Sequence, residues 1–205
     1  MDFEVCYEHV PISQDEEELN AAIAHYRQVL RLNPEHADAH NNLGVAYHCQ
    51  GEVELSIAEY KEALMITPEH ADAHNNLGAA YYGRNDVDLA VMEFETALKI
   101  DSSLVQPHYN LGIAFKAKGR LDLALAELRK VANLDPEEAD TYYYLGEIYS
   151  AQGRVGDAIE SYRRFTELAP SEDAALILEV HGRIEQLKVR DFIDPDLHMN
   201  GAVAV

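Results

Sequence analysis

Cysteine and basic side chains are scarce in this chain of 205 residues. The two cysteines, Cys6 and Cys49, are too few for a disulfide framework and do not have the paired spacing of metal ligands, so reduced thiols are expected. Lys and Arg number 16 against 37 Asp and Glu, which gives a formal net charge of -21. Nucleic acid needs a clustered basic surface, so this balance argues against nucleic acid and favours a basic or polar protein partner.

Long apolar runs and catalytic signatures are also absent from the sequence. No run approaches the ~20 residues of a membrane helix, so no membrane partner is expected. The first residues lack the basic region and apolar core of a signal peptide, which favours a cytoplasmic location. There is no Gly-rich phosphate loop, nucleophile elbow or H-E-x-x-H motif, so we expect neither an enzyme nor a bound cofactor.

What the chain does contain is an internal repeat. The same eleven residues, PEHADAHNNLG, run from Pro34 to Gly44 and again from Pro68 to Gly78, starting 34 residues apart. Self-similarity at a fixed period of this size is typical of a solenoid, in which each unit buries its apolar face against its neighbours. The repeat therefore predicts the fold class.

Further positions recur at the same period. Leu-Gly pairs stand at 43–44, 77–78, 111–112 and 145–146, and an aromatic residue follows each Gly three positions later. The second half of each unit carries a small residue and then a large one, as in Ala90 and Phe94. Gly51, Asn85, Gly119 and Gly153 stand near the middle of the units, where a tight turn needs a residue that tolerates the left-handed conformation. Each unit thus reads as helix, turn, helix.

These features resemble the tetratricopeptide repeat, whose signature includes the 34-residue period, Leu-Gly followed by Tyr, a later Ala and Phe, and a closing Pro. The resemblance implies an all-α, right-handed α-solenoid of helix-turn-helix units. The expected division is a leader at 1–14, a half repeat at 15–36, full repeats at 37–70, 71–104, 105–138 and 139–172, a capping helix at 173–189 and a flexible tail at 190–205.

Three asparagines occupy equivalent places on successive first helices, which line the concave surface in this family. Asn42, Asn76 and Asn110 should form a ladder whose amides can pair with both the N–H and the C=O of a peptide. This resembles the asparagine ladder in the repeat arm of O-GlcNAc transferase and implies binding of an extended peptide. The alternative is that these amides cap a helix or bond to the neighbouring helix and bind nothing.

Other candidates for peptide binding lie on or beside the same stripe of helix surface: Asp38, Asp72, Asp140, Tyr109, Tyr143 and Tyr144. The carboxylates could contact Lys or Arg of a partner, or could serve only to favour the starts of their helices. The tyrosines would form an aromatic patch, unless Tyr143 packs against the next unit. We assign Tyr142 to the core.

The histidine pairs His36/His40 and His70/His74 have the i, i+4 spacing that can bring two imidazoles to one metal ion. The first member of each pair falls before its helix begins, the second occupies a packing position, and no further ligand completes the set. No metal site is therefore expected.

The sequence accordingly favours a non-enzymatic adaptor that holds an extended segment of another protein in a groove. A second hypothesis is a homo-oligomer in which the incomplete terminal units stack head to tail, although Glu179 and Arg183 stand where that stacking would need Leu and Tyr. A third is a repeat arm that acts beside an enzyme such as a glycosyltransferase.

Overall fold

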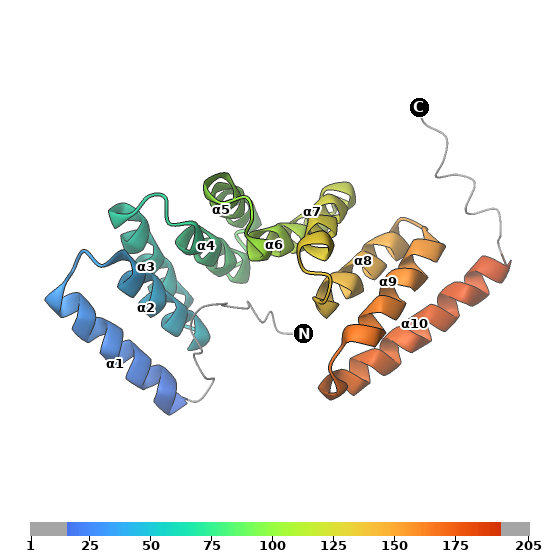
Figure 1. The fold of residues 1–205 in the computed structure, drawn as a ribbon, viewed down its shortest axis with the longest axis horizontal. Helices are drawn as coiled ribbons and strands as arrows, with labels where there is room; N and C mark the ends of the chain where they lie inside the picture. The colour runs from blue at the N-terminus through green and yellow to red at the C-terminus, as the bar shows by residue number, and fades with distance from the viewer. Residues whose placement is uncertain (1–15, 194–205) are drawn as a thin grey trace. The chain divides into compact units, whose positions relative to one another are not determined.

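A computed structural model describes residues 16–193, with side chains described as far as Val189. The helices, in chain order in Figure 1, are α1 (Glu16–Leu32), α2 (Ala37–Cys49), α3 (Val53–Ile66), α4 (Ala71–Gly83), α5 (Val87–Ile100), α6 (Val105–Ala117), α7 (Leu121–Leu134), α8 (Ala139–Ala151), α9 (Val155–Leu168) and α10 (Ala174–Ile193). A short 3-10 turn (Ser171–Asp173) precedes α10. No strand occurs among these described residues, and the expected all-α solenoid is confirmed.

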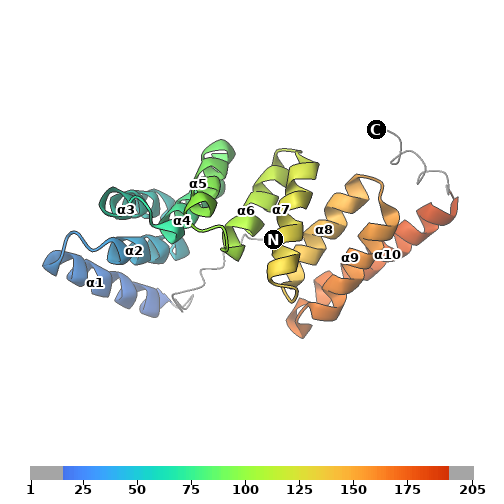
Figure 2. The same cartoon turned by 45° about the horizontal axis from the view of Figure 1, so that its top comes forward.

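Helices that are consecutive in the chain pack as antiparallel neighbours within two compact units, residues 1–114 and 115–205, whose division falls inside α6. In the first unit, α1 packs on α2, α2 on α3, α3 on α4 and α4 on α5. In the second unit, α7 packs on α8, α8 on α9 and α9 on α10, and Figure 2 shows α8, α9 and α10 side by side.

The turn inside each helix pair has the conformation that the sequence predicts. Gly51, Gly119 and Gly153 have φ between 70° and 79°, and Asn85 takes the same place with φ 69°. The turn after α4 closes with hydrogen bonds from the Asn85 N–H to the Tyr82 carbonyl and from the Asp86 N–H to the Tyr81 carbonyl, both 2.8 Å long. These bonds satisfy carbonyls that the end of a helix leaves unpaired.

The Leu-Gly pairs are explained by a close approach between the two helices of a unit. A Cβ atom on Gly78 would lie 2.7 Å from Cδ1 of Phe94, and one on Gly44 would lie 2.6 Å from Cε1 of Tyr60. Both rings are fully buried. Glycine is therefore required at this position because the ring of the second helix fills the space that a side chain would occupy.

The last helix closes the second unit with one apolar face. Val180, Ile184 and Leu187 of α10 are buried, whereas Leu178 is 74% exposed. The helix continues to Ile193, past the expected end at Val189. The expected leader at 1–14 and residues 194–205 of the expected tail lie outside the described residues.

Gly78→Ala is expected to lower the free energy of unfolding by about 1–3 kcal/mol, because the new methyl group overlaps the Phe94 ring. Gly83→Ala, on the same helix, is the matched control, since a Cβ there meets no atom within 4 Å. That control should be neutral or stabilising by up to ~1 kcal/mol through helix propensity. Urea denaturation followed by circular dichroism measures both changes, and equal stability of the two variants would contradict the packing argument.

Candidate functional site

The side-chain amides of α2, α4 and α6 form hydrogen bonds from one helix to the next. Asn110 Nδ2 donates to Asn75 Oδ1 over 2.9 Å, and Asn76 Nδ2 donates to Asn41 Oδ1 over 3.0 Å. All four side chains are buried, with exposed fractions between 4% and 7%. Burial of an amide is unfavourable unless it is hydrogen-bonded, so these pairs stabilise the contact between neighbouring first helices.

Weaker bonds within each helix join these pairs into a single chain. Asn75 Nδ2 donates to Asn76 Oδ1 over 3.5 Å, and Asn41 Nδ2 donates to Asn42 Oδ1 over 3.4 Å. Gln106 Nε2, one turn before Asn110 on α6, donates to Asn110 Oδ1 over 3.3 Å. We call this run the amide chain: Gln106, Asn110, Asn75, Asn76, Asn41 and Asn42. Every bond in it is donated in the same direction, toward Asn42, so the bonds polarise one another.

The predicted ladder residues are therefore present on successive helices, but each of them bonds to another amide. Asn76 and Asn110 reach the neighbouring helix, which is the alternative that the sequence left open, and only Asn42 is half-buried. Asn41 and Asn75 were not among the predicted ladder residues. Their signal was the doubled Asn-Asn in both copies of the eleven-residue repeat.

The three candidate aspartates lie in the first turns of α2, α4 and α8 and are exposed. The Asp38 side chain is 74% exposed, and its Oδ1 lies 3.2 Å from Nε2 of His70 in the next repeat. A carboxylate in the first turn is stabilised by the helix dipole.

The histidines have structural contacts in place of metal ligation. His36 and His70 cap α2 and α4, because the Nδ1 atom of each accepts the backbone N–H three residues later. His74 contacts Glu93 Oε2 through Nδ1 at 2.6 Å and the Pro68 carbonyl through Nε2 at 3.0 Å. His40 makes the equivalent contacts with Glu59 and the Pro34 carbonyl. Residues 16–193 contain no cluster of three His, Cys, Asp or Glu that could hold a metal ion.

Tyr142 shows why a ring with a polar tip recurs at this place in the repeat. Its hydroxyl donates to the Pro136 carbonyl over 3.1 Å, which is the same contact that His40 and His74 make to their prolines. Tyr142 is half-buried, so its assignment to the core was too strong. The position needs a flat side chain whose far edge reaches the carbonyl that precedes the helix.

The candidate tyrosines differ in exposure. Tyr109 and Tyr144 are half-buried, whereas Tyr143 is 7% exposed and packs edge-on against Tyr162 and Phe165. Tyr144 lies edge-on to Tyr143 with the ring centroids 5.4 Å apart. Tyr143 therefore belongs mainly to the core of the second unit, and Tyr144 offers more of its ring to solvent.

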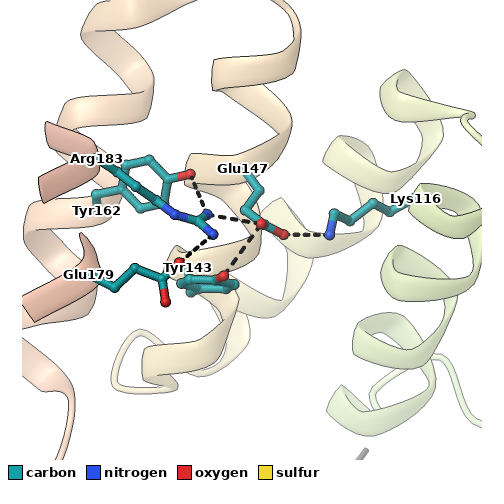
Figure 3. Close-up of polar contacts among 6 residues, drawn as sticks. All are labelled: Lys116, Tyr143, Glu147, Tyr162, Glu179 and Arg183. Carbon is teal, nitrogen blue, oxygen red and sulfur yellow. Dashed lines mark hydrogen bonds and ion pairs between the residues drawn. The ribbon is translucent and has the colours of Figure 1, made fainter. Parts of the chain in front are cut away.

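Glu147 of α8 lies between two cations in the second unit (Figure 3). Its Oε2 atom forms a short ion pair with Lys116 Nζ, and its Oε1 atom lies 3.0 Å from Arg183 Nη1 of α10. Arg183 also contacts Glu179 over 2.8 Å, and each cation lies over a tyrosine ring: Lys116 over Tyr144 and Arg183 over Tyr143. These contacts tie α6, α8 and α10 together.

The electrostatic surroundings shift the titration of this group of residues. Burial would raise the pKa of Glu147, but hydrogen bonds from Lys116 and Arg183 outweigh it and hold the pKa below its usual value. Burial, with the nearby charge of Glu147, raises the pKa of Tyr143 to about 12. Glu147 is therefore ionised and Tyr143 neutral at physiological pH. In the sequence, the sign of this ion-pair network around Glu147 was Arg183, because the other repeats have an aromatic residue at its position.

The fold and these sites define a helical-repeat protein with polar networks on its first helices. A family profile for the TPR repeat matches residues 15–51, 46–85 and 80–119, and one for the tetratricopeptide repeat matches residues 109–173. These matches cover most of the chain, which belongs to the tetratricopeptide repeat family. Members are generally non-catalytic scaffolds that bind peptides or other proteins. No curated protein matches the chain.

Several solved structures have a similar fold. MamA is 22% identical with a TM-score of 0.68, over 78% of this chain and 92% of that one. YrrB, described as a TPR protein with an unusual peptide-binding site, is 24% identical with a TM-score of 0.66, over 81% and 84%. TTC0263 of Thermus thermophilus is 21% identical with a TM-score of 0.64, over 84% and 92%. At this level of identity the likeness concerns the fold alone.

Asn75→Ala is expected to lower the free energy of unfolding by about 1–3 kcal/mol, because it leaves the buried Nδ2 of Asn110 without an acceptor. Asn42→Ala removes only the half-buried end of the amide chain and should cost less than ~1 kcal/mol. Urea denaturation compares the two variants. If their losses were equal, the amide chain would not stabilise the first unit.

Glu147→Gln is expected to lower the free energy of unfolding by about 1–3 kcal/mol at neutral pH, since charge-assisted bonds to two cations are lost. The folded-state pKa of Glu147 is depressed, so its contribution is present above the unfolded pKa of about 4.3 and is lost as pH falls through the folded value. Denaturation at a series of pH values should show the difference between wild type and variant shrinking under acid conditions. A difference independent of pH would contradict this assignment.

Proposed function

We propose that the protein is a non-enzymatic scaffold that binds an extended peptide segment of another protein along the amide chain of its first unit. The observation that carries this proposal is that the chain of bonds has two open ends. Within residues 16–193, Nδ2 of Asn42 has no acceptor and Oε1 of Gln106 has no donor. A peptide bond offers both of these missing groups, a carbonyl for Asn42 and an N–H for Gln106.

The buried amides take part by positioning the two ends. Each of the four inner asparagines is held by its neighbours, so Asn42 and Gln106 lose little freedom when a ligand binds. Asn76 and Asn110 thus contribute to peptide binding mainly by positioning the ends of the amide chain. Resemblance to the asparagine ladder of O-GlcNAc transferase, and to a TPR protein with a peptide-binding site, supports a peptide as the ligand.

Charge supports a basic or polar ligand. Residues 1–114 contain 20 acidic and five basic side chains, and the exposed Asp38 and Asp72 stand one turn before Asn42 and Asn76. These carboxylates would pair with Lys or Arg of the peptide, and binding would weaken as salt increases. In the second unit, Asp140 and the rings of Tyr143 and Tyr144 remain further candidates for contacts with the partner, as does Tyr109 of α6.

Affinity capture from native lysate, read by mass spectrometry, tests this function with the variant Asn42→Ala/Gln106→Ala. Both residues are half-buried, so the fold should be kept while the two open ends are removed. Gln28→Ala/Asn133→Ala is the matched control, because it removes two exposed amides from α1 and α7. Partners should be lost with the first variant alone.

Calorimetry on peptides from a captured partner then gives the size of the effect. Two lost hydrogen bonds should weaken the affinity about tenfold, at roughly 0.5–1.5 kcal/mol each. Equal capture by the wild type and both variants would refute the role of the amide chain. A mass that rises with concentration, with no partner captured, would instead favour head-to-tail self-assembly.

A further inference from the structure

Exposed apolar side chains recur on the second helices of the repeats. Leu55 of α3, Leu89 of α5 and Leu123 of α7 stand 34 residues apart and are 45%, 41% and 45% exposed. The first unit adds Met92 of α5 and Met65 of α3, which are 61% and 75% exposed. Single exposed apolar residues are ordinary. Leu55 and Leu89, however, occupy the same position in neighbouring repeats, which gathers them on one side of the first compact unit.

A polar contact joins the turn before α5 to the start of α3. Arg84, just before α5, donates from Nη1 to both carboxylate oxygens of Glu54 in the first turn of α3, each over 3.1 Å. Leu55 follows Glu54 directly, and Leu89 lies in the first turn of α5. The two leucines therefore lie near this contact, on the second helices of successive repeats. We call the surface formed by Leu55, Leu89 and Met92 the α3–α5 face.

α3 and α5 carry six acidic and two basic side chains, and two of the carboxylates are open to a partner. Glu62 lies about two turns after Leu55 on α3, and Glu95 one turn after Met92 on α5; both are exposed and form no hydrogen bond or ion pair with residues 16–193. The nearby cation Arg84 is already held by Glu54 and Asp86. An apolar strip with open carboxylates at its side is complementary to an apolar strip with basic residues at its side.

We propose that the α3–α5 face binds a helical segment of a partner protein that carries leucine-like residues on one side and Lys or Arg beside them. A helix presents such residues at i, i+3, i+4 and i+7, which matches a narrow apolar strip on the second helices of two successive repeats. This surface lies on α3 and α5, whereas the amide chain lies on α2, α4 and α6, so the two sites can be tested separately.

Charge disfavours the occupants that the chain itself could supply. Residues 1–15 and 194–205 contain six acidic side chains and no Lys or Arg, so they would be repelled by Glu62 and Glu95. A second copy of the chain would bring the same acidic surface. A basic segment from another protein is therefore the occupant that this face fits.

The test uses the full chain and a synthetic amphipathic peptide of about 18 residues, or five helical turns, made of leucine and lysine with all leucines on one side. Matched peptides carry glutamate in place of lysine, or the same residues in scrambled order. Fluorescence anisotropy measures the affinities. The leucine–lysine peptide should bind at least about tenfold more tightly than either matched peptide.

Variant proteins locate the binding. Leu55→Ser/Leu89→Ser/Met92→Ser should weaken the leucine–lysine peptide at least about tenfold, and the exposed positions should leave melting unchanged. Leu32→Ser/Leu134→Ser/Leu178→Ser, also at exposed positions, is the control and should bind as the wild type does. Glu62→Gln/Glu95→Gln should reduce the preference for lysine over glutamate.

Four outcomes would overturn the proposal. If the triple serine variant bound as tightly as the control, the peptide would be held only by the net charge of the protein. If light scattering showed a dimer that the triple serine variant abolishes, the face would be an interface between copies. If the face bound zwitterionic lipid vesicles in preference to the peptide, its occupant would be a membrane. Loss of peptide binding in Asn42→Ala/Gln106→Ala alone would place the peptide at the amide chain.

Discussion

The close contact between a glycine and an aromatic ring inside three of the helix pairs is the constraint on which the other contacts depend. Tyr60, Phe94 and Tyr162 fill the space beside Gly44, Gly78 and Gly146, in the three pairs whose contacts are described. The distance between two packed helices is set by the side chains at their contact, so this arrangement fixes the geometry of each pair. Repetition of that geometry brings neighbouring first helices close enough for amides to bond across them.

The period of the sequence predicted the helix pairs because the same residue types meet the same requirements in each unit. The prediction succeeded even for Asn85, which has the left-handed conformation that glycine has at the other turns. The same prediction placed Asn42, Asn76 and Asn110 in a ladder but did not include the hydrogen bonds that join them to other amides. Comparison at the 34-residue period aligns Asn42 with Asn76, whereas the hydrogen bonds join residues 35 apart, such as Asn41 and Asn76.

Contacts of this kind depend on the offset between neighbouring helices, which a single sequence does not contain. The same limit applies to Glu147, which stands three residues after Tyr144 on α8. Its partners Lys116 and Arg183 lie 31 and 36 residues away, so no repeat position links them. The unusual Arg183 was a visible signal, since it replaces an aromatic residue, but its contacts follow only from the packing of α10 on the second unit.

The first helices of the two units therefore differ in chemistry: those of the first unit have paired amides, and those of the second have charged side chains and tyrosine rings. At the positions of Asn41 and Asn75 the later repeats have Tyr109 and Tyr143, so the pairing of amides cannot continue beyond Asn110. The amide chain ends there on Gln106 of the same helix, and the second unit has an ion-pair network over tyrosine rings. Amides suit the backbone of a peptide, whereas charges and rings suit its side chains.

The direction of the amide chain gives its two ends opposite roles, a donor at Asn42 and an acceptor at Gln106. Every amide donates toward Asn42, and each donor in such a series is strengthened by the bond that its own oxygen accepts. Asn42 lies at the end of five successive bonds, so its open N–H is the most polarised donor of the series. Gln106 has only its oxygen open, at the start of the series. The oxygen of Gln106 is strengthened in the same way, because its own amide donates into the series, so both open ends would bind the proposed peptide more strongly than isolated amides.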